Sequence, residues 1–280
     1  MTPSSLQAPP RVISLSSDVS GLADLSGSRV DSGPRETQKP RILGLPPSWF
    51  FLAAGAILSN LFALPVLSFC GWFIASLAHE MGHSLAAWLC GMPAFPAIRL
   101  DGHAAAMWSA QTTWLVFALT GLLGYLAWRV RHIPVAAIAL LLVTLLQPVI
   151  AFTGASEFFC LAAGHGGELL FAGICFWRTV VGGFTGSEAE RCLYATLGWY
   201  LLAKNLTLFS GLMTSFEAIV EYHGSGSFGM TNDLIRIAED VVGWPLQSVA
   251  TLMFVITLTV LPVSLMAWRV RPQVDPAWNC

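Results

Sequence analysis

The chain has 280 residues, of which 55% are hydrophobic and 11% are charged, and its mean hydropathy is +0.66. This composition excludes an ordinary soluble domain and is typical of a multi-pass membrane protein. The formal net charge is only -2 and the Lys and Arg residues are scattered, so nucleic acid is not an expected partner. Six cysteines without a C-x-x-C pair indicate small buried side chains rather than a disulfide framework.

The N-terminal segment, residues 1–47, is rich in Ser and Pro and contains no long apolar stretch. A segment of this kind cannot bury enough surface to fold alone, so we expect a disordered tail. We assign residues 48–271 to a membrane-embedded domain and residues 272–280 to a C-terminal tail.

Seven apolar segments of the membrane-embedded domain have the length expected of membrane spans. The first two are separated at Pro65, and the second ends at the Gly-Met-Pro stop signal of residues 91–93. The expected spans are 48–64, 66–90, 113–130, 133–153, 156–178, 191–213 and 247–268. The predicted fold is therefore an all-α, multi-pass transmembrane bundle of about six to eight spans. Its expected surroundings are a lipid bilayer of the bacterial cytoplasmic type.

The second expected span contains the sequence His79-Glu80-Met81-Gly82-His83. Residues four apart lie on the same face of a helix, so His79 and His83 can present two imidazole nitrogens to one metal ion. Glu80 lies beside this pair, where its carboxylate can take a proton from water that the metal activates. Three ionisable groups in five residues are costly at membrane depth, which favours a zinc hydrolase site over residues that only pack helices.

Residues 92–112 are too polar to cross a membrane. Residues 97–100 and 103–106 flank Asp101-Gly102, and a two-residue Asp-Gly link is typical of a type I′ β-hairpin. The exposed edge of such a hairpin could accept an extended substrate as a further strand. An ordinary surface loop is the alternative interpretation.

A hydrolytic zinc site needs three protein ligands and an open position, so the histidine pair requires one more ligand. Counting about 1.5 Å of rise per residue from the membrane face where the second span ends, His83 and His79 lie roughly 12 and 18 Å deep. His165 and Glu168, in the fifth span, lie roughly 14 and 18 Å below the same face. We therefore predict Glu168 as the third ligand, with His165 as an alternative ligand or a group that contacts the site.

Two aspartates rank lower as ligands. Asp101 is too shallow by the same count, unless the loop that holds it re-enters the membrane. Asp233 lies between the last two spans, in a loop that would have to fold inward. In that loop, Thr231 or Asn232 could cap a short helix through about residue 242, which would lie on the membrane surface or cover the site.

The sixth span contains a polar pair, Lys204 and Asn205, at a depth of roughly 15 to 17 Å. A buried pair at this level could hold a substrate carbonyl or stabilise an oxyanion. A hydrogen bond between helices with a snorkelling lysine is the alternative.

The His-Glu-x-Gly-His sequence in an apolar helix resembles the signature of the site-2-protease family of intramembrane zinc metalloproteases. The family cuts membrane-anchored proteins within or near the bilayer, and the resemblance implies zinc at His79 and His83 with Glu80 as the base. The strand-forming segment after the helix is similar too, and the match extends over about residues 66–110. The family usually takes its third ligand from an Asn-x-x-Pro-x-x-x-Leu-Asp-Gly segment in a later helix, which no late span here contains. Residues 100–102 match its last three letters but follow the first motif too closely to lie in a separate helix.

The predicted function is hydrolysis of peptide bonds in membrane proteins or membrane-anchored peptides, with Zn²⁺ as the cofactor. One alternative is a membrane metalloprotease of the prenyl-protein-processing kind, which pairs H-E-x-x-H with a glutamate ligand. Another is a metal or proton transporter that uses His79, His83, His165 and Glu168 as its path. A pseudoprotease scaffold is a third alternative, against which the intact motif argues.

Overall fold

The computed structural model describes residues 47–99, 104–181, 187–225 and 231–270. These residues are mostly helical and include a two-stranded antiparallel sheet. In chain order the elements are α1 (Pro47–Leu58), η1 (Ser59–Ala63), α2 (Pro65–Leu89), β1 (Ala94–Ile98), β2 (Ala104–Trp108), α3 (Thr113–Arg129), α4 (Pro134–Ala151), α5 (Ala155–Val181), α6 (Glu188–Thr214), α7 (Phe216–Gly224), α8 (Asp233–Arg236), η3 (Ile237–Val242) and α9 (Leu246–Val270). The expected N-terminal tail and C-terminal tail lie outside the described residues, apart from Pro47.

Three described helices are long and apolar enough to cross a membrane, namely α4, α5 and α9. A fourth span is possible only if α1 with η1 and α2 count together, and these two halves meet at a bend of 109°. The other expected spans are present as the helices α3, of 17 residues, and α6, which carries several charged side chains. The structure is thus compatible with a membrane protein, whereas a count of six to eight spans is not confirmed.

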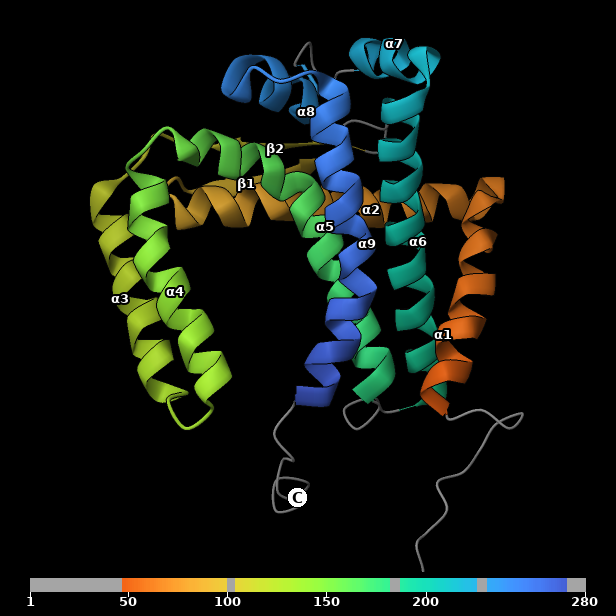
Figure 1. Ribbon diagram of the computed structural model, residues 1–280, viewed down its shortest axis with the longest axis horizontal. Coiled ribbons are helices and arrows are strands. Elements are labelled where there is room, and N and C mark those ends of the chain that lie inside the picture. Colours follow the sequence, from red (N-terminus) through yellow and green to blue (C-terminus); the bar gives the residue numbers. More distant parts are fainter. Residues whose placement is uncertain (1–46, 100–103, 182–186, 226–230, 271–280) are drawn as a thin grey trace, which may run out of the picture. The chain divides into compact units, whose positions relative to one another are not determined.

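Helix α2 runs across its neighbours. Figure 1 shows α1, α5, α6 and α9 side by side, α3 and α4 as a separate antiparallel pair, and α2 extending over both groups. Leu64 is extended, with φ −72° and ψ 138°, and Pro65 begins α2 because its ring lacks the N–H that a continuing helix would need. A depth counted along α2 therefore does not measure depth below the membrane face, which is the assumption that the ligand prediction used.

Small residues bring α2 and α5 into contact where they cross. A Cβ atom added to Gly82 would overlap the backbone of Ala163 and Gly167, and one added to Gly167 would overlap the backbone of Ala78 and Gly82. Glycine at both positions lets the two backbones approach closely, as is common between membrane helices. This crossing holds the His-Glu-x-x-His segment directly against α5.

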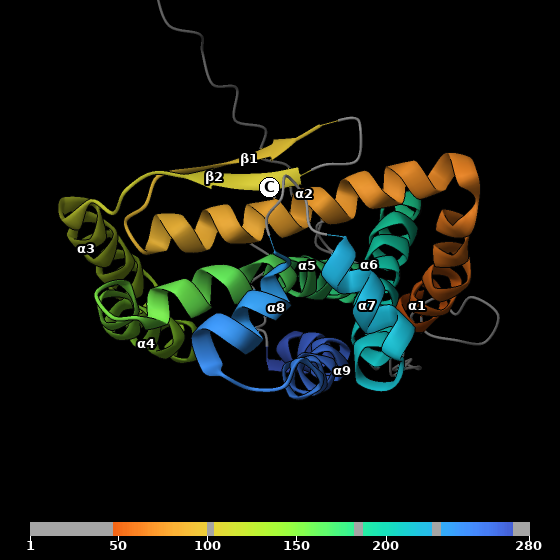
Figure 2. The same cartoon turned by 90° about the horizontal axis from the view of Figure 1, so that it is seen from above.

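The predicted β-hairpin is confirmed, and it follows α2 directly. β1 and β2 pair from Ala94 opposite Trp108 to Ile98 opposite Ala104, so the strands reach further from the turn than the sequence suggested. The turn itself, including Asp101, lies outside the described residues. Figure 2 shows the hairpin lying alongside α2, and the Trp88 indole donates a hydrogen bond of 2.8 Å to the Ala94 carbonyl.

The short helix predicted before residue 242 is confirmed as α8 and η3. It begins after Asn232 and ends before Gly243, whose φ of 70° suits a residue without a Cβ. The Asn232 amide donates to the Tyr222 carbonyl and to Ser225 Oγ, which ties α8 to α7, a helix that the sequence analysis does not anticipate. Leu234, Ile235, Ile237 and Ala238 join a buried cluster with residues of α5, α6 and α9. Helix α8 therefore packs onto the bundle.

Candidate metal centre

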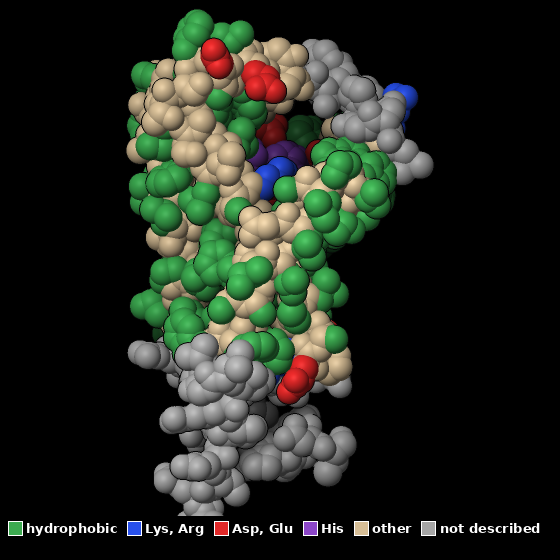
Figure 3. All heavy atoms as spheres, turned by 90° about the vertical axis from the view of Figure 1, so that its right-hand side faces the viewer, with side chains coloured by type: hydrophobic (Ala, Val, Ile, Leu, Met, Phe, Trp, Pro, Cys, Tyr) green, Lys and Arg blue, Asp and Glu red, His purple; other side chains and the backbone are tan. Residues whose placement is uncertain are grey.

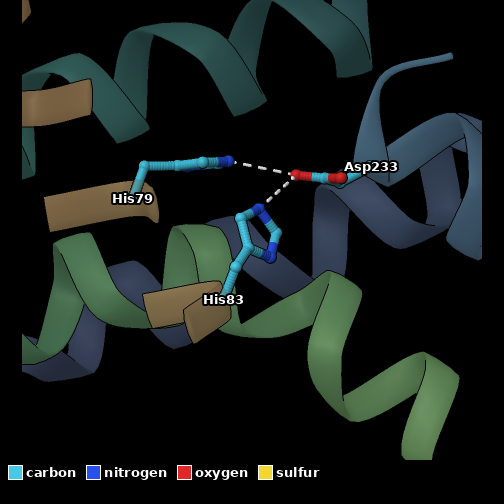
Figure 4. A group of neighbouring side chains, drawn as sticks. All are labelled: His79, His83 and Asp233. Atoms are coloured by element: carbon cyan, nitrogen blue, oxygen red, sulfur yellow. Dashed lines mark hydrogen bonds and ion pairs between the residues drawn. The ribbon is translucent and has the colours of Figure 1, made fainter. Parts of the chain in front are cut away.

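Two imidazole nitrogens and one carboxylate oxygen converge at the start of α8. His79 Nε2 lies 3.0 Å and His83 Nε2 lies 2.9 Å from the same oxygen, Asp233 Oδ2 (Figure 4). The histidines lie on one face of α2 because they are four residues apart, as the sequence predicts. His79, His83 and Asp233 thus form a group that could hold a metal ion.

The remaining nitrogen of each imidazole faces a second oxygen, on α5. His79 Nδ1 lies 3.1 Å from Glu168 Oε1, and His83 Nδ1 lies 2.7 Å from the Cys160 carbonyl. A neutral imidazole has one N–H, so it cannot donate to oxygens at both nitrogens. If each Nδ1–H donates to α5, both Nε2 lone pairs point at Asp233, and a cation between them removes the repulsion. The donor set therefore fits a bound metal cation.

Gly164 of α5 makes room for the two imidazoles. A Cβ atom built at this position would overlap the rings of both His79 and His83. The backbone of α5 thus forms one wall of the centre, and no larger residue fits there without moving a ligand.

Asp233 lies outside the candidate membrane spans, in the four-residue helix α8. Burial alone would raise the pKa of its carboxyl group, but hydrogen bonds with His79 and His83 and their charges outweigh this effect. The net result is a pKa well below the usual range of an aspartate. Asp233 is therefore held as a carboxylate, the form that binds metals.

The third ligand predicted from the sequence, Glu168, lies behind His79 rather than beside both Nε2 atoms. It belongs to a second group that could hold a metal, with His79 and His165. However, Lys204 Nζ lies 3.0 Å from Glu168 Oε1, the same oxygen that faces His79. A second cation at this oxygen would meet like charge, so the geometry favours Asp233 as the ligand that completes the histidine pair.

His165, the alternative ligand, is buried between α5 and α6. Its Nδ1 donates a hydrogen bond of 3.1 Å to Asn205 Oδ1, and its ring packs edge-on against His79 with the centroids 4.7 Å apart. It therefore packs against one histidine of the centre, His79, and is fixed by Asn205 of α6.

Asn205 has no N–H left to donate to a substrate oxygen. Its amide nitrogen donates to Glu168 Oε2 at 2.5 Å and to the Leu201 carbonyl at 2.9 Å, while its oxygen accepts from His165. The predicted oxyanion contact from Asn205 is therefore not favoured by the structure. Lys204 differs, because it lines the cavity next to the centre.

A cavity of about 560 Å³ lies in front of the centre. Figure 3 shows it as a hollow in which histidine, acidic and basic side chains gather. Its lining includes His79, Glu80, His83 and Asp233, together with all five residues of β2 and none of β1. The carboxylate of Glu80 accepts a hydrogen bond from the backbone of Ala106 in β2. The expected base, the candidate metal ligands and an edge of β2 that pairs with no other described strand therefore border one space.

Comparison with protein-family models, curated proteins and solved structures finds no match to this chain. The chemistry of the centre follows from its own groups. Two imidazoles and one carboxylate are a donor set that zinc accepts, and a cavity lies in front of them.

Proposed function

We propose that the chain is a membrane-embedded zinc metallopeptidase that hydrolyses peptide bonds of membrane proteins or membrane-anchored peptides. The observation that supports this function best is the convergence of His79 Nε2, His83 Nε2 and Asp233 Oδ2 beside a cavity that Glu80 also lines. The helices α4, α5 and α9, each long and apolar enough to span, support a multi-pass location in a bilayer.

A zinc ion held by His79, His83 and Asp233 would supply a Lewis acid for the substrate carbonyl and for water. Glu80 is placed to accept a proton from water and to return it to the leaving amine. The Ala106 backbone orients the Glu80 carboxylate, and Glu80 is only 6% exposed. Lys204, which lines the same cavity, is a positive group that can approach a developing negative charge.

The β2 strand supports a peptide as the substrate. In the described residues β2 pairs only with β1, and all five of its residues line the cavity. An extended peptide can add to this edge through backbone hydrogen bonds, without regard to its side chains. A helical substrate must therefore unwind locally before it reaches Glu80.

The test measures zinc content and cleavage of a fluorescent membrane-anchored peptide by the purified full-length protein. We expect Glu80→Gln to retain zinc at the wild-type stoichiometry and to lose cleavage, because only the base is removed. Asp233→Asn should lose both zinc and cleavage. Asp240→Asn is the matched control, since Asp240 is exposed on η3 and outside the cavity lining. Cleavage that persists in Glu80→Gln, or wild-type protein that binds no zinc, would overturn the proposal.

The same variants separate the alternatives. A prenyl-protein-processing type of site needs Glu168 as a ligand, but this carboxylate is occupied by Lys204 and Asn205. A metal or proton transporter has no use for Glu80 as a base, so Glu80→Gln would leave ion flux into proteoliposomes in place and no variant would show cleavage.

A further inference from the structure

Glu168 is the most enclosed ionisable side chain around the centre. It is 1% exposed and lies on α5, three residues after His165. One carboxylate oxygen faces His79 Nδ1 at 3.1 Å and Lys204 Nζ at 3.0 Å, and the other faces the Asn205 amide at 2.5 Å. Burying a carboxylate is costly unless each of its oxygens is paired. The partners of both Glu168 oxygens therefore indicate that this carboxylate has a role at the centre.

The comparison with His83 indicates what Glu168 does. Both histidines receive their orientation from α5, but His83 Nδ1 faces a backbone carbonyl, that of Cys160, at 2.7 Å. His79 Nδ1 faces a side chain instead. In both rings the acceptor at Nδ1 leaves Nε2 as the nitrogen that faces Asp233. A histidine that binds a metal usually donates its other N–H in this way, which sets its tautomer and its ring angle.

We propose that Glu168 is a positioning residue for metal binding: it accepts the Nδ1–H of His79 and so keeps His79 Nε2 directed at the metal. Lys204 and Asn205, both from α6, hold the carboxylate in the orientation that this contact needs. The inference rests on the metal centre of the proposed function, but not on its peptidase activity.

Two other roles of Glu168 predict different results. As a direct ligand, its removal would change the ligands around the metal. As a purely structural residue, its removal would lower stability and leave the metal affinity of the folded protein unchanged. The loss of a positioning residue gives a third result: the metal affinity falls by about 10- to 100-fold while the ligands stay the same.

The experiment titrates purified full-length protein with Co²⁺ and follows the visible absorption of the bound ion, normalised to the folded fraction. We expect Glu168→Gln and Glu168→Ala to lower Co²⁺ affinity by about 10- to 100-fold, with the absorption spectrum at saturation unchanged. Glu168→Asp, which keeps the charge on a shorter side chain, should recover part of the loss. Asp233→Asn is the comparison for a true ligand, and its spectrum should change or vanish.

Thr179→Val is the matched control for a structural effect. Thr179 is also on α5 and fully buried, and its hydroxyl donates to the Cys175 carbonyl at 2.9 Å, away from the cavity. This variant should lower thermal stability without changing Co²⁺ affinity. Should Glu168→Gln fold poorly, Lys204→Gln tests the same contact, because that side chain is 37% exposed at the cavity, and it should reduce affinity by less than Glu168→Gln.

The outcomes separate this inference from the proposed function. Unchanged Co²⁺ affinity in Glu168→Gln and Lys204→Gln, or a changed spectrum in Glu168→Gln, would overturn the positioning role while leaving zinc-dependent cleavage intact. Conversely, reduced affinity in a protein that cleaves no peptide would support the positioning role and count against the peptidase. Wild-type protein that binds no Co²⁺ would remove both.

Discussion

The two faces of α2 border cavities of opposite character. One face carries His79, Glu80 and His83 and lines the cavity of about 560 Å³ that also holds Asp233. The other face, with Met81 and Leu85, lines a cavity of about 860 Å³ whose described lining contains no charged side chain. Helix α2 therefore lies between a polar cavity, which suits water and a peptide, and an apolar cavity, which suits hydrocarbon. Hydrolysis within a membrane requires this separation, because water must reach the scissile bond without opening the surrounding apolar contacts.

Helix α5 repeats the same division with two glycines. Gly164 faces the imidazoles of His79 and His83, whereas a Cβ added to Gly166 would meet nothing within 4 Å, and Gly166 lines the apolar cavity.

The largest effect that we predict concerns substitution of these two glycines. Gly164→Ala should abolish zinc binding and cleavage, because the added methyl group overlaps both ligands. Gly166→Ala should leave zinc content at the wild-type level, since the same methyl group points into open space.

Zinc content of the two purified variants, with thermal unfolding as a check that both fold, measures this difference. Equal zinc content in Gly164→Ala and Gly166→Ala would show that the histidine rings do not lie against Gly164. Loss of zinc in Gly166→Ala alone would reverse the assignment of the two faces.

The contrast between these faces shows how much of the site the sequence could predict. The polar and apolar faces of α2 can be predicted from the sequence, because residues three and four apart lie on the same face of a helix. The helix positions from α3 to α6 and α9 follow from apolar runs in the same way. The direction of α2 does not, because a helix that crosses its neighbours and one that runs along them have the same composition.

The position of Asp233 beside the histidine pair escaped prediction for a related reason. Asp233 is 150 residues from His83 along the chain, and no local pattern joins them. What brings Asp233 inward is the burial of Leu234 and Ile235 against α5, α6 and α9, which is a property of packing between distant segments. The available signal was the predicted helix after Asn232, with an acidic residue at its start and apolar residues directly behind it.

A charge on the apolar face of α2 provides the next test of the comparison. Leu85 is half-exposed and lines the apolar cavity. If hydrocarbon fills that cavity, Leu85→Lys should lower the free energy of unfolding by about 2.5 to 3.5 kcal/mol, the cost of a lysine at the centre of a bilayer. Leu85→Met, of similar volume, is the control and should change it by less than about 1.5 kcal/mol. Unfolding by SDS titration in mixed micelles measures both.

The Leu85 variants also report on the independence of the two faces. Folded Leu85→Lys protein should bind zinc with the wild-type affinity, because Leu85 lines only the apolar cavity. A lysine tolerated at no cost would indicate that water fills both cavities, and the two faces of α2 would then not differ in character.

The smallest effect that we predict concerns an ion pair that links α8 to α5, on the polar side of α2. Arg236 Nη2 lies 2.9 Å from Glu157 Oε1 and links α8 to the start of α5, but the two side chains are 31% and 55% exposed. Exposed pairs of this kind contribute less than about 1 kcal/mol. The fully buried Leu234 and Ile235 of the same helix offer much larger apolar contacts. We therefore expect apolar packing, and not this ion pair, to keep Asp233 at the histidines.

A double-mutant cycle of Arg236→Gln and Glu157→Gln measures the contribution of the pair to zinc affinity. The coupling should be below about 1 kcal/mol, which corresponds to less than about a fivefold change in affinity. The pair Arg178–Glu190, with a closest N–O distance of 3.5 Å and away from the cavity, is the control and should show no coupling to zinc binding. A coupling well above 1 kcal/mol would mean that electrostatic docking of α8 sets the position of Asp233. The polar face of α2 would then depend on a surface charge pair, whereas the apolar face depends on packing alone.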